Sequence, residues 1–210
     1  MEVEKITLET EVHYSDDRYH RYLISKVWDS KAKQATIIML NPSTASSLAI
    51  DMTTMYIINN ISKLGFGGVE IVNIFSKLNE EINNDICADL LTDKTNDQMI
   101  VASVARTDTT ILAWGKGGET NKQVQLRIKA VRSLLKEYNH KLYEICDDKG
   151  RHGWHPLAPS IRFGWALKKM EIEDDEKEIT KAEKVTEQTN SEGNDKSKSQ
   201  LKDNHKSRKK

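Results

Sequence analysis

Long hydrophobic runs, cysteine and net charge are all scarce in this sequence. No apolar stretch reaches the roughly 18 residues that a membrane-spanning helix needs, and no charged-then-apolar leader follows Met1, so we expect a cytoplasmic protein without membrane contact. Cys87 and Cys146 lack partners at metal-ligand spacing, which predicts buried, reduced thiols rather than a disulfide or a zinc site. The formal net charge of +0 does not favour general binding of DNA or RNA through phosphates, although a local basic patch stays open.

Apolar residues become very sparse in the last part of the chain. The hydrophobic fraction of 37% is low for one fully packed domain of 210 residues. From Glu171 onward there are 10 basic and 11 acidic residues and no aromatic residue, a composition that cannot bury enough apolar surface to fold. We therefore predict a folded domain over 1–170 and a disordered tail over 171–210. Its acidic start and basic end are typical of a solubilising extension, with an electrostatic arm for nucleic acid as the alternative.

The segment Thr36–Ala45, TIIMLNPSTA, has the strongest local pattern. Its β-branched and apolar residues predict a buried strand. The strand should end near Asn41, because Pro42 donates no ladder hydrogen bond and disfavours helix at the residue before it. Ligands of open α/β sheets lie at the carboxyl ends of the strands. Asn41, Ser43 and Thr44 are therefore expected at a binding edge with free amide and hydroxyl groups.

Strand and helix patterns alternate along the rest of the domain. One or two edge strands are expected within 7–27. Three further segments have the composition of buried strands: 69–75, 109–115 and 141–146. Helices are predicted at 46–64, 95–106 and 121–138, with short helical pieces in 78–93 and 161–170. This alternation predicts an α/β fold, a three-layer domain with a short, mainly parallel central sheet and N-terminal edge strands.

A parallel sheet would gather these strand ends at one edge. Asn73 lies near the end of the second buried strand, a glycine loop at Gly115 follows the third, and a loop with His155 and Pro156 follows the fourth. Pro156 restricts the backbone beside the histidine, whose ring N–H is suited to an oxygen that gains negative charge. The candidate site is therefore the edge that carries Asn41, Asn73, Gly115 and His155.

Three features near this edge have plainer interpretations. The glycine loop Ala113–Gly118 lacks both the Gly-Lys-Ser/Thr and the G-x-G-x-x-G pattern, so a tight strand-to-helix turn is favoured over backbone contact with a ligand phosphate. Asp147 and Asp148 have no carboxylate partner at the other strand ends, so a Mg²⁺ site is not expected. Ser160 lacks a G-x-S-x-G elbow and is not expected to act as a nucleophile.

Four motifs carry a resemblance to a known family: Met39–Ala45 (MLNPSTA), Val72–Phe75 (VNIF), Ala113–Gly115 (AWG) and His155–Leu157 (HPL). Over 18–170 the chain resembles the bacterial and mobile-element family called domain of unknown function 1643. The order of the motifs is in turn similar to that of the uracil-DNA glycosylase superfamily, whose fold is a short parallel sheet between helices.

The glycosylase resemblance implies a role for each matched residue. In that superfamily a loop after the first strand positions the attacking water, a later asparagine reads the amide edge of a flipped pyrimidine, and a terminal histidine steadies the departing base. By resemblance Asn41 and His155 are catalytic and Asn73 reads the base. The other matched residues are Pro42, Ser43 and Phe75 at the base, and Gly115, Pro156 and Ser160 as loop contacts.

The chain departs from the glycosylase pattern at several of these positions. Asn41 stands where the efficient members have an aspartate, and an amide cannot act as a base. Leu157 replaces a serine that contacts phosphate, and Pro159 replaces the leucine that wedges into the DNA stack. We therefore expect a glycosylase-like protein with a nucleobase-type pocket that is weakly active or inactive in excision, a pseudo-glycosylase that needs no cofactor or metal.

Such a protein would act by binding. By family analogy its expected partner is an acidic, DNA-mimicking inhibitor of glycosylases, and its binding to nucleic acid would be weak. Two alternatives stay open. One is an active N-glycosidic hydrolase on uracil or a modified base, with Asn41 orienting water and His155 supporting the leaving base. The other is a non-enzymatic scaffold that uses the domain for protein contacts and the tail for tethering.

Overall fold

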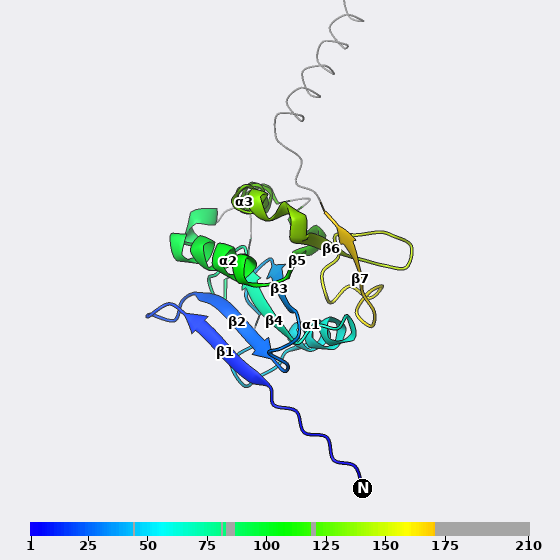
Figure 1. Ribbon diagram of the computed structural model, residues 1–210. Helices are drawn as coiled ribbons and strands as arrows, with labels where there is room; N and C mark the ends of the chain where they lie inside the picture. Colours follow the sequence, from blue (N-terminus) through cyan, green and yellow to red (C-terminus); the bar gives the residue numbers. More distant parts are fainter. Residues whose placement is uncertain (44, 81, 83–86, 119–120, 171–210) are drawn as a thin grey trace, which may run out of the picture. The chain divides into compact units, whose positions relative to one another are not determined.

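The computed structural model describes residues 1–43, 45–80, 82, 87–118 and 121–170. The predicted tail over 171–210 and Thr44 lie outside these described residues. The described chain forms a mixed α/β domain around one seven-stranded sheet, whose strands follow the order β1-β2-β4-β3-β5-β6-β7. Figure 1 shows the strands side by side in this order.

The centre of the sheet is parallel and both edges are antiparallel. The four parallel strands are β3 (Gln34–Met39), β4 (Gly68–Asn73), β5 (Thr109–Leu112) and β6 (Leu142–Cys146). The antiparallel strands are β1 (Glu9–Tyr14) and β2 (Arg21–Val27) beyond β4, and β7 (Ala166–Lys169) beyond β6. The four buried strands predicted from the sequence therefore form the parallel core of a mixed sheet.

Three α-helices connect the parallel strands, and each begins at a side-chain cap. They are α1 (Met52–Lys63), α2 (Lys94–Arg106) and α3 (Lys122–Leu134), capped by Asp51, Asp93 and Asn121. These caps accept a backbone N–H from the third following residue at 2.7, 2.8 and 3.1 Å. The first two caps explain why the helices expected from Ser46 and Thr95 begin instead at Met52 and Lys94. Short 3₁₀ helices are η1 (Ala88–Leu90), η2 (Gly115–Gly118) and η3 (Lys136–Lys141).

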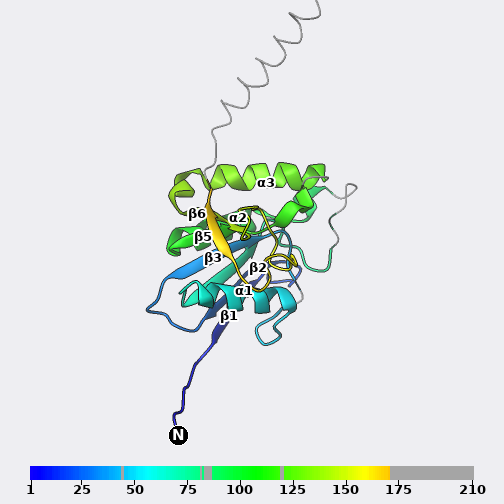
Figure 2. The ribbon, with the colours of Figure 1, turned by 90° about the vertical axis from the view of Figure 1, so that its right-hand side faces the viewer.

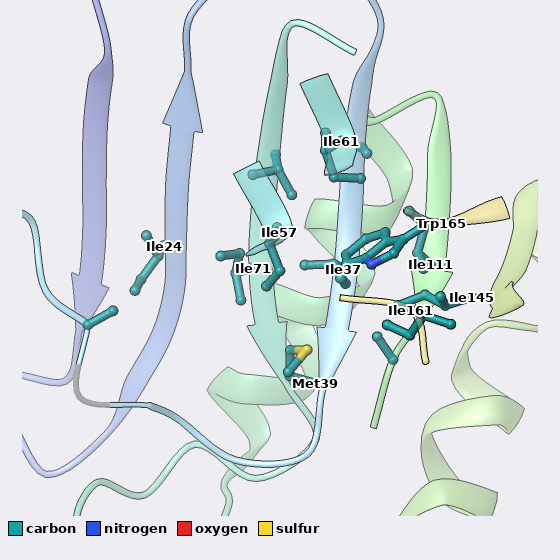
Figure 3. Packing of buried hydrophobic residues seen from close by; sticks show 14 residues of the cluster. Ile24, Ile37, Met39, Ile57, Ile61, Ile71, Ile111, Ile145, Ile161 and Trp165 are labelled. Atoms are coloured by element: carbon teal, nitrogen blue, oxygen red, sulfur yellow. The ribbon is translucent and has the colours of Figure 1, made fainter. Parts of the chain in front are cut away.

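Helices cover both faces of the sheet. Figures 1 and 2 show α1 on one face and α2 with α3 on the other. On the α1 face, Ile37 of β3 packs in one buried cluster with Ile57 and Ile61 of α1, and Trp165 joins them from the end of the domain (Figure 3). On the other face, the Thr36 hydroxyl is hydrogen-bonded to Ser103 of α2 at 2.9 Å. This alternation along β3 is what a strand buried between two helical layers requires.

The segment 161–170 corrects the predicted closing helix. It contains a turn followed by β7, which pairs antiparallel with β6. Gly164 disfavours a helix there, and Ile161 and Trp165 are drawn into the core at 1% and 8% exposure. Without β7, the outer edge of β6 would be unpaired, so the closing strand satisfies backbone groups that local sequence does not reveal.

Cysteine burial was only partly predicted. Cys146 is half-buried at the end of β6, but Cys87 is exposed just before η1, so its predicted burial is wrong. Both thiols are free. None of the helices in the described ranges is long and apolar enough to cross a membrane.

Candidate functional site

The loops after β3, β4 and β5 leave the sheet side by side. Beyond the strand ends, the Phe75 N–H still donates to the Leu40 carbonyl at 3.0 Å, and the Ala113 N–H donates to the Ile38 carbonyl at 2.8 Å. The chain runs from β3 outward to β4 and then crosses to β5 on the other side of β3, so the strand order reverses at β3. Such a switch point at the carboxyl edge is where open α/β sheets bind ligands. The predicted residues that it brings to one edge are Asn41, Asn73 and Gly115.

The loop with His155 packs against the end of β5. Gly115 has a φ of +71°, and a Cβ built on it would lie only 2.9 Å from the His155 Cβ. Only glycine fits both this backbone conformation and this close approach. Pro156 is buried and His155 half-buried, so the histidine is held beside the Gly115 turn. The structure thereby joins two of the residues predicted for the site.

The ring of His155 has a defined tautomer. Its Nδ1 lies 3.1 Å from the backbone N–H of Leu157 and accepts that hydrogen bond. Burial lowers the pKa of His155 below its usual value near 6.5, so the ring is neutral at neutral pH. A neutral ring that accepts through Nδ1 carries its proton on Nε2. His155 is therefore set up as a hydrogen-bond donor.

A small basic and aromatic cluster adjoins this histidine. Lys116 Nζ lies 5.3 Å and Arg151 Cζ 5.5 Å from the centroid of the Trp154 ring, within the range of cation–π attraction. The indole N–H of Trp154 donates to the Arg151 carbonyl at 2.9 Å. Arg151 Nε also pairs with Asp147 at 2.8 Å, so Asp147 offsets part of the positive charge of this cluster.

The acidic turn after β6 has a structural role. Asp147 is buried, and its carboxylate accepts from Arg151 Nε at 2.8 Å and from the Lys149 and Arg151 backbone N–H groups. Burial alone would raise the pKa of Asp147, but these hydrogen bonds and the Arg151 charge outweigh it and lower that pKa. Among the described residues, no group of three or more His, Cys, Asp or Glu side chains is arranged to hold a metal ion.

The end of β4 is anchored by buried polar side chains. Asn96 Nδ2 donates to the Asn73 carbonyl at 2.9 Å, and Arg127 Nε donates to the Ile74 carbonyl at 2.7 Å. Asn73 is 2% exposed and Phe75 1% exposed. Asn73 is thus fixed at the strand end, and Phe75 lies in the core rather than on an open surface.

Two buried cations of β2 hold the loop after β3. Arg21 is 2% exposed and donates through Nη1 to the carbonyls of Ser43 at 2.9 Å and Ala45 at 2.5 Å. Lys26 is 1% exposed and donates to the Ser47 carbonyl at 3.3 Å. This burial lowers the pKa of both groups.

The remaining predicted site residues differ in exposure. Asn41 is exposed at the tip of β3, and Pro42 and Ser43 are half-buried behind it. Ser43 Oγ accepts from Arg21 Nη2 at 3.4 Å, so its hydroxyl faces Arg21, which holds this loop. Ser160 is exposed in the turn that precedes Ile161.

Sequence reasoning did not find the residues that support this edge. Arg21 falls in the segment 7–27 expected to form edge strands, where no local signal marks it as buried, yet it is 2% exposed and lies beneath the loop. Arg127 had a visible signal, because it falls three residues after Val124 and four before Val131 on the apolar stripe of α3, and both flanking residues are buried. A charged residue on such a stripe indicates a buried polar partner.

The fold and these contacts define a mixed α/β protein with a candidate ligand site at the carboxyl edge of its parallel strands. Comparison with family models identifies the group to which it belongs. The chain is a member of the family described as protein of unknown function (DUF1643), whose model matches residues 21–157. No curated protein and no solved structure matches the chain.

Proposed function

We propose that this protein is glycosylase-like, that it binds a nucleobase at the carboxyl edge of the sheet, and that it excises the base weakly or not at all. The observation that carries this proposal is His155, held beside Gly115 as a neutral Nε2–H donor. Such a donor suits a base carbonyl oxygen, especially one that gains negative charge. The parallel strands between two helical layers agree with the architecture that the glycosylase resemblance implies.

Two amide side chains support a nucleobase as the ligand. Asn41 is exposed just beyond β3, whereas Asn73 is the last residue of the neighbouring parallel strand β4 and only 2% exposed, so a base must enter between the strand ends to reach it. A side-chain amide offers both a donor and an acceptor. The edge of a pyrimidine such as uracil carries the complementary groups. Anchoring of the Asn73 backbone by Asn96 prepares this position before any ligand arrives.

Weak excision follows from how the nearby carboxylates are used. Asp51, after β3, accepts the Thr54 N–H as the cap of α1, and Asp147, after β6, is bound to Arg151. Hydrolysis of an N-glycosidic bond benefits from a general base on water, and the amide of Asn41 cannot take a proton. We therefore assign the protein a binding role.

The proposed partner is an acidic protein that mimics DNA and inhibits glycosylases. Exposed Lys116, whose Nζ lies 5.3 Å from the centroid of the Trp154 ring, presents positive charge beside the candidate site, while the charge of Arg151 is paired with Asp147. An acidic partner would be steered to this charge, with an on-rate that falls as salt rises.

The test is a cleavage and binding assay with uracil-containing single-stranded and duplex oligonucleotides, run beside an authentic glycosylase. The variants are Asn41→Ala and His155→Ala, with His140→Ala as the matched control because His140 is exposed in η3. We expect little or no excision, weak oligonucleotide binding that both site variants reduce, and capture of a purified DNA-mimic inhibitor.

Other outcomes are equally informative. Excision that both site variants abolish, while His140→Ala keeps it, would establish the active hydrolase instead. Failure to bind either the oligonucleotides or the inhibitor would refute the proposal.

A further inference from the structure

The first residues of the chain continue from β1 as an extended, uncovered segment. Figures 1 and 2 show residues 1–8 running away from the sheet, with no other element beside them. Their apolar side chains are open to solvent, including Val3 at 64%, Ile6 at 71% and Leu8 at 39% exposure. In the described part of the chain, β1 also has no partner strand on its outer edge. An unpaired edge beside exposed apolar side chains is a surface that pairs with another strand.

The uncovered side chains continue the inner face of β1. Val12 packs against the hydrophobic core, and Thr10 Oγ1 accepts from buried Lys26 at 3.1 Å. Side chains alternate along an extended chain, so Leu8 and Ile6 fall on the same face as Thr10 and Val12. The face of β1 that packs against the core therefore continues along residues 6–8, where no element of the described chain covers it.

We propose that a second copy of this chain provides the cover, through an antiparallel pairing of the two N-terminal segments about a two-fold axis at Thr7. In this register Thr7 lies opposite Thr7, Ile6 opposite Leu8, and Lys5 opposite Glu9. Ile6 and Leu8 from both copies form an apolar cluster on one face. The Lys5–Glu9 ion pair occurs twice on the other face.

The same register extends the sheet. Residues 2–5 of each copy lie along 9–12 of the other, so each segment adds a strand to the free edge of β1. Moving the axis by two residues, to Lys5 or to Glu9, would place like charges directly opposite each other. Charge thus favours Thr7 as the axis over these two neighbours.

Sedimentation velocity over a concentration series tests the pairing with the full chain. We expect a reversible dimer. Lys5→Glu or Glu9→Lys replaces both symmetric ion pairs with like charges and should weaken dimerisation at least about tenfold. The double variant Lys5→Glu/Glu9→Lys restores the pairs and should restore the dimer, and Lys31→Glu, an exposed change in the β2–β3 turn, should have no effect.

Disulfide trapping tests the axis directly, in a Cys87→Ser background that removes the exposed native thiol. Thr7→Cys should cross-link two copies, because residues on the axis face each other. Glu11→Cys is the control, since the two copies of this position would be about 26 Å apart. A wild-type chain that stays monomeric throughout, a double variant as weak as the singles, or trapping through Glu11→Cys alone would overturn the proposal.

Discussion

Replacing Gly115 with alanine tests the contact that holds the His155 loop against β5. Gly115 has a φ of +71°, where an L-residue costs about 1–2 kcal/mol. The new Cβ would also lie 2.9 Å from the His155 Cβ, closer than carbon atoms pack, and relieving such overpacking costs a further 1–3 kcal/mol or so. Gly115→Ala should therefore lower the free energy of unfolding by about 2–5 kcal/mol, measured by urea denaturation.

Gly153, in the loop that carries His155, provides a matched control. It has a φ of +77°, but a Cβ there would have no atom within 4 Å. Gly153→Ala should therefore lower the free energy of unfolding only by the cost of the left-handed backbone conformation, about 1–2 kcal/mol. The difference between the two alanine variants isolates the contact with His155.

A double-mutant cycle makes the reasoning refutable. In a His155→Gly background the Cβ that clashes is gone, so Gly115→Ala should cost no more than Gly153→Ala. In a His155→Ala background the Cβ remains, so the full cost should remain. Equal destabilisation by Gly115→Ala and Gly153→Ala in the wild-type background would show that the loop does not pack against β5 in solution.

Three further predictions concern buried polar groups. Arg21→Met should cost about 2–4 kcal/mol by urea denaturation and speed proteolysis after β3, because it leaves the Ser43 and Ala45 carbonyls without their donor. Burial lowers the pKa of His155 in the folded protein, so the contribution of the neutral ring to stability is complete above pH 6.5 and is lost as the pH falls through this lowered pKa. The urea midpoint of His155→Gln should therefore change less with pH over this range than that of the wild type. Burial and the bond to Asp93 raise the pKa of Tyr22 to about 12, so Tyr22→Phe should remove a phenol that titrates near pH 12 from an absorbance titration.

The parallel core of the fold could be predicted because its signals are local. The run from Thr36 to Met39 is β-branched and apolar, and Pro42 ends it, so neither feature depends on a distant partner. The closing strand β7 could not be predicted in this way. It forms because β6 has an open edge, and four residues with two lysines carry little strand signal of their own.

The residues of the candidate site differ in the same way: those placed by local signals could be predicted, and those buried by distant partners could not. Asn41, Asn73 and Gly115 were placed from the sequence because the ends of parallel strands must meet at one edge. Arg21 was not placed, since the burial of a guanidinium is decided by carbonyl groups that another segment delivers. Partners that are remote in the chain determine which charged residues become structural.

The proposed pairing surface and the proposed ligand site lie at opposite ends of the strands. Glu9, where β1 begins, is level with Val27 of β2, which in turn is level with Gly68 at the start of β4. Asn73, at the other end of β4, marks the edge with the candidate site. Dimerisation through residues 1–12 would therefore leave both ligand sites open. Lys5→Glu should weaken the dimer at least about tenfold, and so give a monomeric variant at concentrations where the wild type pairs, without changing the affinity for uracil-containing oligonucleotides. A loss of that affinity in the monomeric variant would mean that the ligand site depends on the second copy, and that the two ends of the sheet are coupled.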